Sequence, residues 1–442
     1  MTQPAPDTTA VAAPLHRLHP LTPLLRGFKF FGAVVALVSV RELSSLGVRR
    51  ALYALPVVIA AAFLMAYVSW RFTWYRVEGR ELHVESGVFF RRSRRVPLER
   101  VQAVDIVRPL VGRALGLAEL RLEVVGRGAT EAPLAYLRED EAHRLRARLL
   151  ALAAGVEEHA PAPAETVLAT VPTRDLVVSV LLLFQVVVGL PVLAVLATGL
   201  LLVDIRVFLG TLPALGSIAY GMGRTALRRV LTEYGFTLAQ SPDGLRLRHG
   251  LLETRAQTVP PGRIQAVRLV QPVLWRRPDW VRVEVDVAGY GGGEQEQLAT
   301  RALLPVAPRA LAEWLVQRIL GPVDIQALAD RGVPRRARWC DPVQWRQLKL
   351  GLTPRLLVVR RGRLRRMVDL IPLAKVQSIR LVQGPLQRRL RLVSVHVDTA
   401  GRHLSTDAAH RDAAEGASLV DEISALARVE RELRRAPAAK DQ

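Results

Sequence analysis

A short cluster of aromatic and basic residues is the part of the sequence best suited to bind a ligand. It reads FFRRSRR over residues 89–95 and holds Phe89, Phe90, Arg91, Arg92, Arg94 and Arg95. Each arginine near an anionic leaflet contributes about 1 kcal/mol of binding free energy, and neighbouring aromatic rings settle at the membrane interface. The cluster therefore predicts contact with a membrane surface. The alternative is a solvated hairpin turn.

Motifs for catalysis or metal binding do not accompany this cluster. The nine histidines show no HExxH spacing, no serine or cysteine nucleophile motif occurs, and GYGGG at 289–293 lacks the GxGxxG spacing. The single cysteine, Cys340, can form neither an intramolecular disulfide nor a metal cage. We expect no catalytic residue, no metal, no cofactor and no enzymatic activity.

The composition points to a membrane protein with basic aqueous parts. The chain has 442 residues, a formal net charge of +22 and half of its residues apolar, which is too long for a single hydrophobic core. Nucleic acid is the rival partner for such charge, but no zinc ligand set, recognition-helix motif or stacking ladder is present. We therefore expect no nucleic-acid binding.

Two pairs of apolar segments are long enough to form transmembrane hairpins. Residues 51–70 are uncharged over the length of a spanning helix, whereas the apolar run within 30–48 is short and its full crossing is left open. Residues 176–203 and 207–223 form the second pair. The last three of these segments contain no ionisable residue, which argues against an ion-transport path.

The distribution of arginine predicts the orientation. Two hairpins place both large aqueous blocks on one side, and that side holds Arg71 and Arg76 after the first pair and Arg224, Arg228 and Arg229 after the second. The positive-inside rule makes this side cytoplasmic. We expect a multi-pass protein of the cell inner (cytoplasmic) membrane.

A repeat occurs three times outside the apolar segments. Residues 96–126 align without a gap with 259–289 and with 371–401, and the match extends upstream to 82, 245 and 357. Period-two alternation followed by glycine predicts strands and turns in each copy, beginning with a β-hairpin. Helical patterns at 136–154, 308–320 and 408–434 close the copies. The unit is expected to be a β-roll or barrel capped by a C-terminal helix.

The order of hairpin, "[VI]P…[RK][VI]Q", arginine-rich turn, "V.V…G" strand and helix resembles bacterial pleckstrin-homology (PH) domain proteins of the YdbS/YdbT type. Two hairpins with three such repeats are similar to the larger, YdbT-like members. The resemblance implies an α+β membrane protein with two transmembrane α-helical hairpins and three PH-like domains. It also implies a smaller PH-domain membrane protein as a possible partner, with a homo-oligomer as the alternative.

The expected domain organisation follows from these assignments. It comprises a disordered tail at 1–27, hairpin 1 at 28–75, the first PH-like domain at 76–155, a linker at 156–174, hairpin 2 at 175–224, the second PH-like domain at 225–322, a linker at 323–347, the third PH-like domain at 348–434 and a tail at 435–442.

Polar residues also recur at fixed positions of the repeat. Arg100, Arg263 and Lys375 are equivalent and are interpreted mainly as structural, with lipid phosphate as the alternative partner. The equivalent glutamines Gln102, Gln265 and Gln377 are expected to be buried hydrogen-bond donors and acceptors. The function expected overall is a non-enzymatic binding or scaffold module for anionic lipid or protein at the cytoplasmic membrane face. The alternative is a subunit of a membrane transport or envelope-stress/resistance complex.

Overall fold

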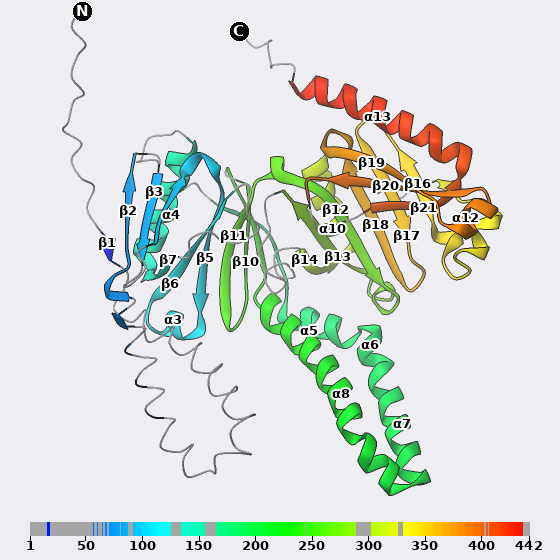
Figure 1. The fold of residues 1–442 in the computed structure, drawn as a ribbon, viewed down its shortest axis with the longest axis horizontal. Helices are drawn as coiled ribbons and strands as arrows, with labels where there is room; N and C mark the ends of the chain where they lie inside the picture. Colours follow the sequence, from blue (N-terminus) through cyan, green and yellow to red (C-terminus); the bar gives the residue numbers. More distant parts are fainter. Residues whose placement is uncertain are drawn as a thin grey trace, which may run out of the picture. The chain divides into compact units, whose positions relative to one another are not determined.

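The computed structural model describes residues 16–17, 70–79, 81–86, 92–124, 134–154, 165–242, 244–288, 302–325, 330–401, 404 and 406–435, with a few single positions between 56 and 68. These residues form two compact units (Figure 1). Unit 1 is Met1–Pro163 with Glu253–Gln257, and unit 2 is Ala164–Leu252 with Thr258–Gln442. Hairpin 1 lies almost entirely outside the described residues.

Unit 1 contains a small antiparallel sheet followed by a second group of strands and a helix. The first sheet has the order β1-β2-β3-β4 and consists of β1 (His16–Arg17), β2 (Trp74–Glu78), β3 (Glu81–Ser86) and β4 (Arg92–Pro97). The 3-10 turn η1 (Leu98–Arg100), β5 (Val101–Pro109), α3 (Leu110–Ala114), β6 (Leu117–Val124), β7 (Leu134–Arg138) and α4 (Glu139–Ala154) follow.

The core of unit 1 forms where alternating strand residues meet α4. Leu82 and Leu120 are fully buried, as is Leu149 on the helix. Ala142, Leu145 and Leu149 are spaced so that they share one face of α4, which packs on the strands. Three acidic residues occupy the first turn of α4, where they are favoured by the helix dipole.

Unit 2 begins with β8 (Thr166–Thr170) and four helices, α5 (Thr173–Leu181), α6 (Phe184–Val187), α7 (Gly189–Val203) and α8 (Ile205–Glu233). Two stretches, Gln185–Val203 and Ile205–Glu233, have the length and composition of membrane-spanning helices. The sequence assigned 176–203 to one apolar segment, but Leu176 and Val180 of α5 are buried in the fold. The crossing helix therefore starts after α5.

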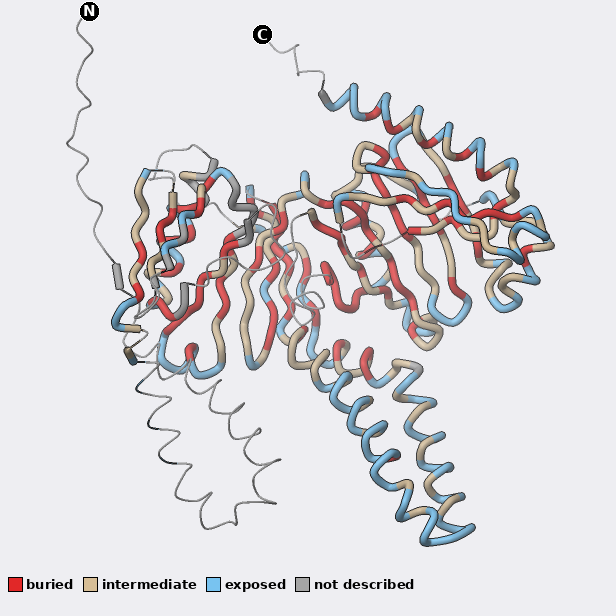
Figure 2. Tube along the Cα trace, viewed as in Figure 1, coloured by how far each residue is buried: buried red, intermediate tan, exposed pale blue. Residues whose placement is uncertain are grey.

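The helices α7 and α8 carry apolar side chains that the fold does not cover (Figure 2). Leu202 and Val203 are each 81% exposed, as expected of side chains that face lipid. Asp204 caps α8, because its side chain accepts a 2.7 Å hydrogen bond from the N–H of Arg206. Gly189 lies against Met222, so the helices approach closely where α7 begins.

Strands of the second and third repeats complete unit 2. The second repeat has β9 (Thr237–Ser241), β10 (Gly244–His249), β11 (Glu253–Val259), η2 (Pro261–Arg263), β12 (Ile264–Pro272), η3 (Val273–Arg276), β13 (Trp280–Val287), β14 (Ala302–Pro308) and α10 (Arg309–Leu320). The third has β16 (Lys349–Leu352), β17 (Leu356–Arg361), β18 (Arg365–Pro372), η6 (Leu373–Lys375), β19 (Val376–Val382), α12 (Pro385–Arg389), β20 (Leu392–Thr399), β21 (Thr406–Asp412) and α13 (Ala413–Arg435).

A strand of each later repeat also pairs with a strand of the repeat before it. β18 of the third repeat pairs antiparallel with β12 of the second, with Leu269 opposite Val368 and Pro272 opposite Arg365. β11 of the second repeat pairs in the equivalent register with β5 of the first, with Ile106 opposite Ala256. The third strand of one repeat therefore extends the second sheet of the repeat before it.

The strands of the third repeat lie in two sheets. The larger has the order β14-β13-β12-β18-β17-β16-β15, where β15 is Arg331–Gly332, and the smaller has the order β19-β20-β21. Val395 and Leu419 are among the buried residues that join the smaller sheet to α13. In the third repeat β21 comes before α13, so the helix begins at Ala413, later than the helical pattern from 408 indicated.

The segments expected to be linkers contain ordered elements. β8 lies within 156–174 and pairs with β9, and the span 323–347 contains β15 and the 3-10 turns η4 (Arg335–Trp339) and η5 (Trp345–Gln347). Both segments add an edge strand to a sheet, which their sequences did not indicate.

Candidate functional site: an arginine-lined pocket at the base of α8

The end of α8 brings charged side chains from the membrane-spanning region into the fold. The helix is uncharged from Val207 to Gly223, and then Arg224, Arg228 and Thr232 follow at four-residue intervals. Arg229 and Glu233 form a parallel row one residue further on. Residues four apart lie on one face of a helix, so these side chains project together.

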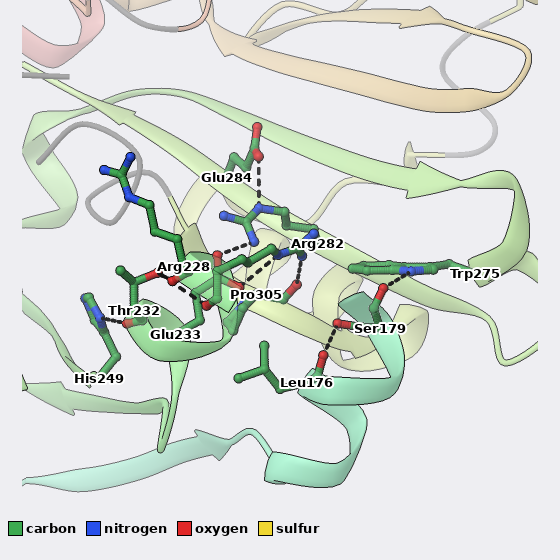
Figure 3. Close-up of polar contacts among 11 residues, drawn as sticks. Leu176, Ser179, Arg228, Thr232, Glu233, His249, Trp275, Arg282, Glu284 and Pro305 are labelled. Atoms are coloured by element: carbon green, nitrogen blue, oxygen red, sulfur yellow. Dashed lines mark hydrogen bonds and ion pairs between the residues drawn. The ribbon is translucent and has the colours of Figure 1, made fainter. Parts of the chain in front are cut away.

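Glu233 is the centre of a buried ionic network (Figure 3). It accepts a 2.6 Å hydrogen bond from Nη1 of Arg282 on β13 and a 3.1 Å bond from Nε of Arg229. Arg282 also donates from Nε to Glu284 at 2.9 Å. The Glu233 side chain is 6% exposed and that of Arg282 12%, so water screens these charges little.

The network keeps the Arg282 guanidinium charged. Burial alone would lower the pKa of Arg282, but the negative charges of Glu233 and Glu284 outweigh it, and the pKa lies above its ordinary value. A further hydrogen bond joins Nη2 of Arg229 to the carbonyl oxygen of Pro305 on β14, at 3.3 Å. The network thus ties α8 to the strands of the second repeat.

Trp275 forms the apolar wall beside the network. Its ring is buried, and its indole N–H donates a 2.9 Å hydrogen bond to the carbonyl oxygen of Ser179 on α5 (Figure 3). The Arg229 guanidinium lies 5.4 Å from the ring centroid, in cation–π geometry. The indole hydrogen bond thereby joins η3 to α5.

A pocket of about 830 Å³ opens beside these groups. Its lining combines apolar side chains, among them Leu183, Val273 and Leu274, with five arginines and two glutamates. The arginines are Arg224, Arg228, Arg229, Arg282 and Arg365, and the glutamates are Glu233 and Glu284, so the lining carries a net charge of three positive.

This combination suits an amphipathic anion. Arginine presents a planar fork of donors that matches the oxygens of phosphate, and the apolar part of the lining can hold hydrocarbon. Within the described residues, no group of three or more His, Cys, Asp or Glu side chains could hold a metal ion. The geometry therefore supports binding of a phosphate-bearing, partly apolar molecule.

The structure places the aromatic and basic cluster at β4. Phe89, Phe90 and Arg91 lie outside the described residues, Arg92 and Arg94 belong to β4 by their backbone, and Arg95 is exposed.

The strand register gives the position of the facing ends of β3 and β4. Trp74, the first residue of β2, is opposite Glu85, and Ser86 is opposite Arg92. Ser86 and Arg92 thus lie at the end of the sheet where β2 follows the helical residues Trp70 and Arg71. Contact between the cluster and the membrane stays a prediction.

The equivalent basic positions of the repeat have different surroundings. Nζ of Lys375 donates a 2.6 Å hydrogen bond to the carbonyl oxygen of Gly262 in η2, so it joins the third repeat to the second. Arg263 lies in η2 and Arg100 in η1.

The recurring glutamines also differ. Gln265 is buried and donates to the carbonyl oxygen of Arg263, as expected, whereas Gln377 on β19 is exposed. Gln102 lies on β5. Burial of this position is therefore not common to the repeats.

From the sequence, Arg224, Arg228 and Arg229 indicated only the orientation of the protein in the membrane. They did not indicate that these side chains line a pocket. Arg282 lies within the alternating strand VRVEVDV, where a charged residue looks like a solvent-facing position. Their convergence depends on the packing of β13 against α8. The one available signal was the change from an uncharged run to arginines at helical spacing.

Comparison with known sequences gives the family. The sequence profile described as Bacterial PH domain matches residues 31–153, 166–323 and 328–427. The chain belongs to the bacterial PH domain family. This confirms the resemblance drawn from the repeated motifs.

A relative within the family is a transmembrane protein. YdbT, a transmembrane protein of Bacillus subtilis (strain 168), is 24% identical over 308 residues, which cover 61% of this chain and 60% of the relative. The alignment therefore spans about three fifths of the relative's length. No solved structure gives a significant match.

Proposed function

We propose that this bacterial PH domain protein is a non-enzymatic, membrane-anchored binding module that holds anionic lipid head groups at the cytoplasmic face of the membrane. The observation that carries the proposal is the arginine-lined pocket at the base of α8. The pocket follows directly on an apolar helix and combines cationic and hydrocarbon-compatible walls. A phospholipid in the same membrane presents matching phosphate and acyl groups.

The pocket is tested with the purified full-length chain and phosphatidylglycerol. The double variant Arg224→Gln/Arg228→Gln removes two cations from the lining while the network of Glu233 stays in place. At about 1 kcal/mol for each arginine, affinity for phosphatidylglycerol should fall about 30-fold. Native mass spectrometry of the protein released from detergent measures the bound lipid directly.

The matched control is Arg389→Gln/Arg428→Gln, which removes the same charge from exposed positions outside the pocket. It should retain parental affinity. Inorganic phosphate and phosphatidylcholine serve as separate competitors, because they distinguish a free anion from a lipid head group. Equal phosphatidylglycerol binding by the pocket variant and the parent, at equal thermal stability, would refute the proposal.

The cluster at 89–95 is proposed as a second, shallower membrane contact. Phe89→Cys in a Cys340→Ser background provides a single site for an environment-sensitive fluorophore on the full-length chain. In anionic nanodiscs its emission should shift to shorter wavelength, and replacing Arg91, Arg92, Arg94 and Arg95 with glutamine should reduce the shift. An emission that is the same in anionic and zwitterionic discs would contradict an electrostatic membrane contact.

A further inference from the structure

The strand β19 presents an uncovered edge. Within the described part of the chain, it pairs with β20 on one side and with no strand on the other. Ser378, Arg380, Leu381 and Val382 are all exposed. A sheet edge with exposed apolar residues is a template for pairing with another chain unless something covers it.

The two earlier repeats show what covers the equivalent edge. β12 occupies the position of β19 in the second repeat, and β18 pairs along it. β5 occupies that position in the first repeat, and residues Glu253–Ala256 pair along it in the same register. In both cases the added strand is the third strand of a following PH-like repeat.

Burial at matched positions separates the third repeat from the other two. Ile106 and Leu269 are 1% and 7% exposed, but the equivalent Leu381 is 48% exposed. At the next position Val107 and Val270 are each 2% exposed, and Val382 is 46% exposed. All three repeats have aliphatic residues at these two positions, but in the third repeat no neighbouring strand covers them within the described part of the chain. The edge of β19 therefore has the composition of an interior strand.

We propose that β19 is the docking edge for the third strand of a PH-like repeat in a separate protein chain, which adds antiparallel to Ile379–Val382. This extends the binding role proposed above from lipid to protein. It rests on a different surface from the pocket, so either proposal can fail without the other.

The charge of Arg380 on β19 indicates which residue the partner strand should carry opposite it. Arg268 on β12 is paired with Asp369, the residue opposite it on β18. The equivalent of Arg268 on β19 is Arg380, whose side chain is 63% exposed and contacts Asp398 of the neighbouring strand β20. A partner strand with a carboxylate opposite Arg380 restores the pairing found inside the chain.

A second copy of this chain fits the edge poorly. Its third strand is β4, which is itself an edge strand, and the same register places Arg94 opposite Arg380. Like charges directly opposite each other destabilise a strand pair. Arg94 therefore works against self-association in this register, while β19 stays open to an acidic partner.

Register-specific disulfide trapping tests the proposal. The full-length Cys340→Ser/Leu381→Cys protein in nanodiscs is equilibrated in glutathione buffer with a peptide copying β18, RRMVDLIP. The peptide carries cysteine either at the position of Val368, expected opposite residue 381, or at that of Met367, expected opposite Val382. Directly opposite residues come close enough for a disulfide, so the first peptide should be captured in clear excess.

A second part of the experiment tests the charge requirement with the peptide that is captured. Arginine in place of its aspartate should lower the yield up to about fivefold, and Arg380→Glu in the protein should restore it. The matched control is Leu433→Cys, at an exposed position on α13. It measures how much disulfide forms by random collision of peptide and protein.

Three results would overturn the proposal. They are equal capture of the two peptides, capture no greater than at Leu433→Cys, and preferential cross-linking of Leu381→Cys to Ser93→Cys of a second copy. The last result would identify this chain itself as the occupant.

Discussion

Glu233 compensates two buried guanidinium groups with one carboxylate. Arg229 and Arg282 both donate to it, and neither has enough access to water to remain charged without cost. A buried charge that loses its partner is far more destabilising than a broken surface pair. The residue therefore belongs to the framework of the pocket and not to its ligand-binding rim.

Glu233→Gln is expected to destabilise the folded protein by about 3–5 kcal/mol. The amide cannot balance the charges of Arg229 and Arg282. Thermal unfolding of the purified protein in one detergent measures the change.

Glu422→Gln is the matched control for this variant. Glu422 pairs with Arg331 on the surface, where both side chains are 43% exposed, and its loss should cost at most about 1 kcal/mol. Similar losses for the two variants would contradict the description of Glu233 as the buried centre of the network.

At the scale of elements, Gly189 allows α7 and α8 to approach. A Cβ atom at this position would lie 2.5 Å from Cε of Met222, whereas Gly199, further along α7, has no atom within 4 Å. The structure thus places a contact between α7 and α8 at Gly189.

Gly189→Leu is expected to lower the unfolding free energy by about 1 kcal/mol, since the side chain overpacks the helix contact but Cε of Met222 is the end of a flexible side chain that can move aside. Gly199→Leu should have a much smaller effect. Thermal melting in nanodiscs compares the two, and Met222→Ala should recover part of the loss in Gly189→Leu. Equal destabilisation at both glycines would show that the close approach at Gly189 is not formed in the membrane.

The order of strands and helices was predictable because each repeat carries it in local sequence patterns. Alternation around Leu82 and Val283 marks strands with a buried face, and both residues are buried. The strand pairing between repeats was not predictable, because β11 and β18 have the same sequence pattern whether or not they also pair with the preceding repeat. Burial of Leu176 on α5 was also missed, since an apolar residue facing protein looks the same in sequence as one facing lipid.

At the scale of the whole molecule, the single cysteine is a natural reporter of orientation. Cys340 lies at the end of η4, partly exposed. Burial and the neighbouring charge of Asp341 raise the pKa of the Cys340 thiol, which lowers its thiolate fraction at neutral pH. Labelling is therefore best carried out at alkaline pH.

We expect a membrane-impermeant maleimide to label Cys340 in inverted vesicles and not in intact cells. The expectation rests on the arginines that follow α8 and on the positive-inside rule. Val203→Cys in a Cys340→Ser background, at the turn between α7 and α8, should show the opposite pattern. Labelling of Cys340 from outside the cell would reverse the proposed topology.

Strand pairing between repeats also has a consequence for synthesis on the ribosome. The strand β12 emerges well before β18, so a nascent chain that has just completed the second repeat still lacks the strand that covers Leu269 and Val270. The first and second repeats therefore each wait for the next repeat before their second sheets are covered. A transcript truncated after the second repeat should yield a protein that chaperones retain or proteases remove, even though every residue of that repeat is present.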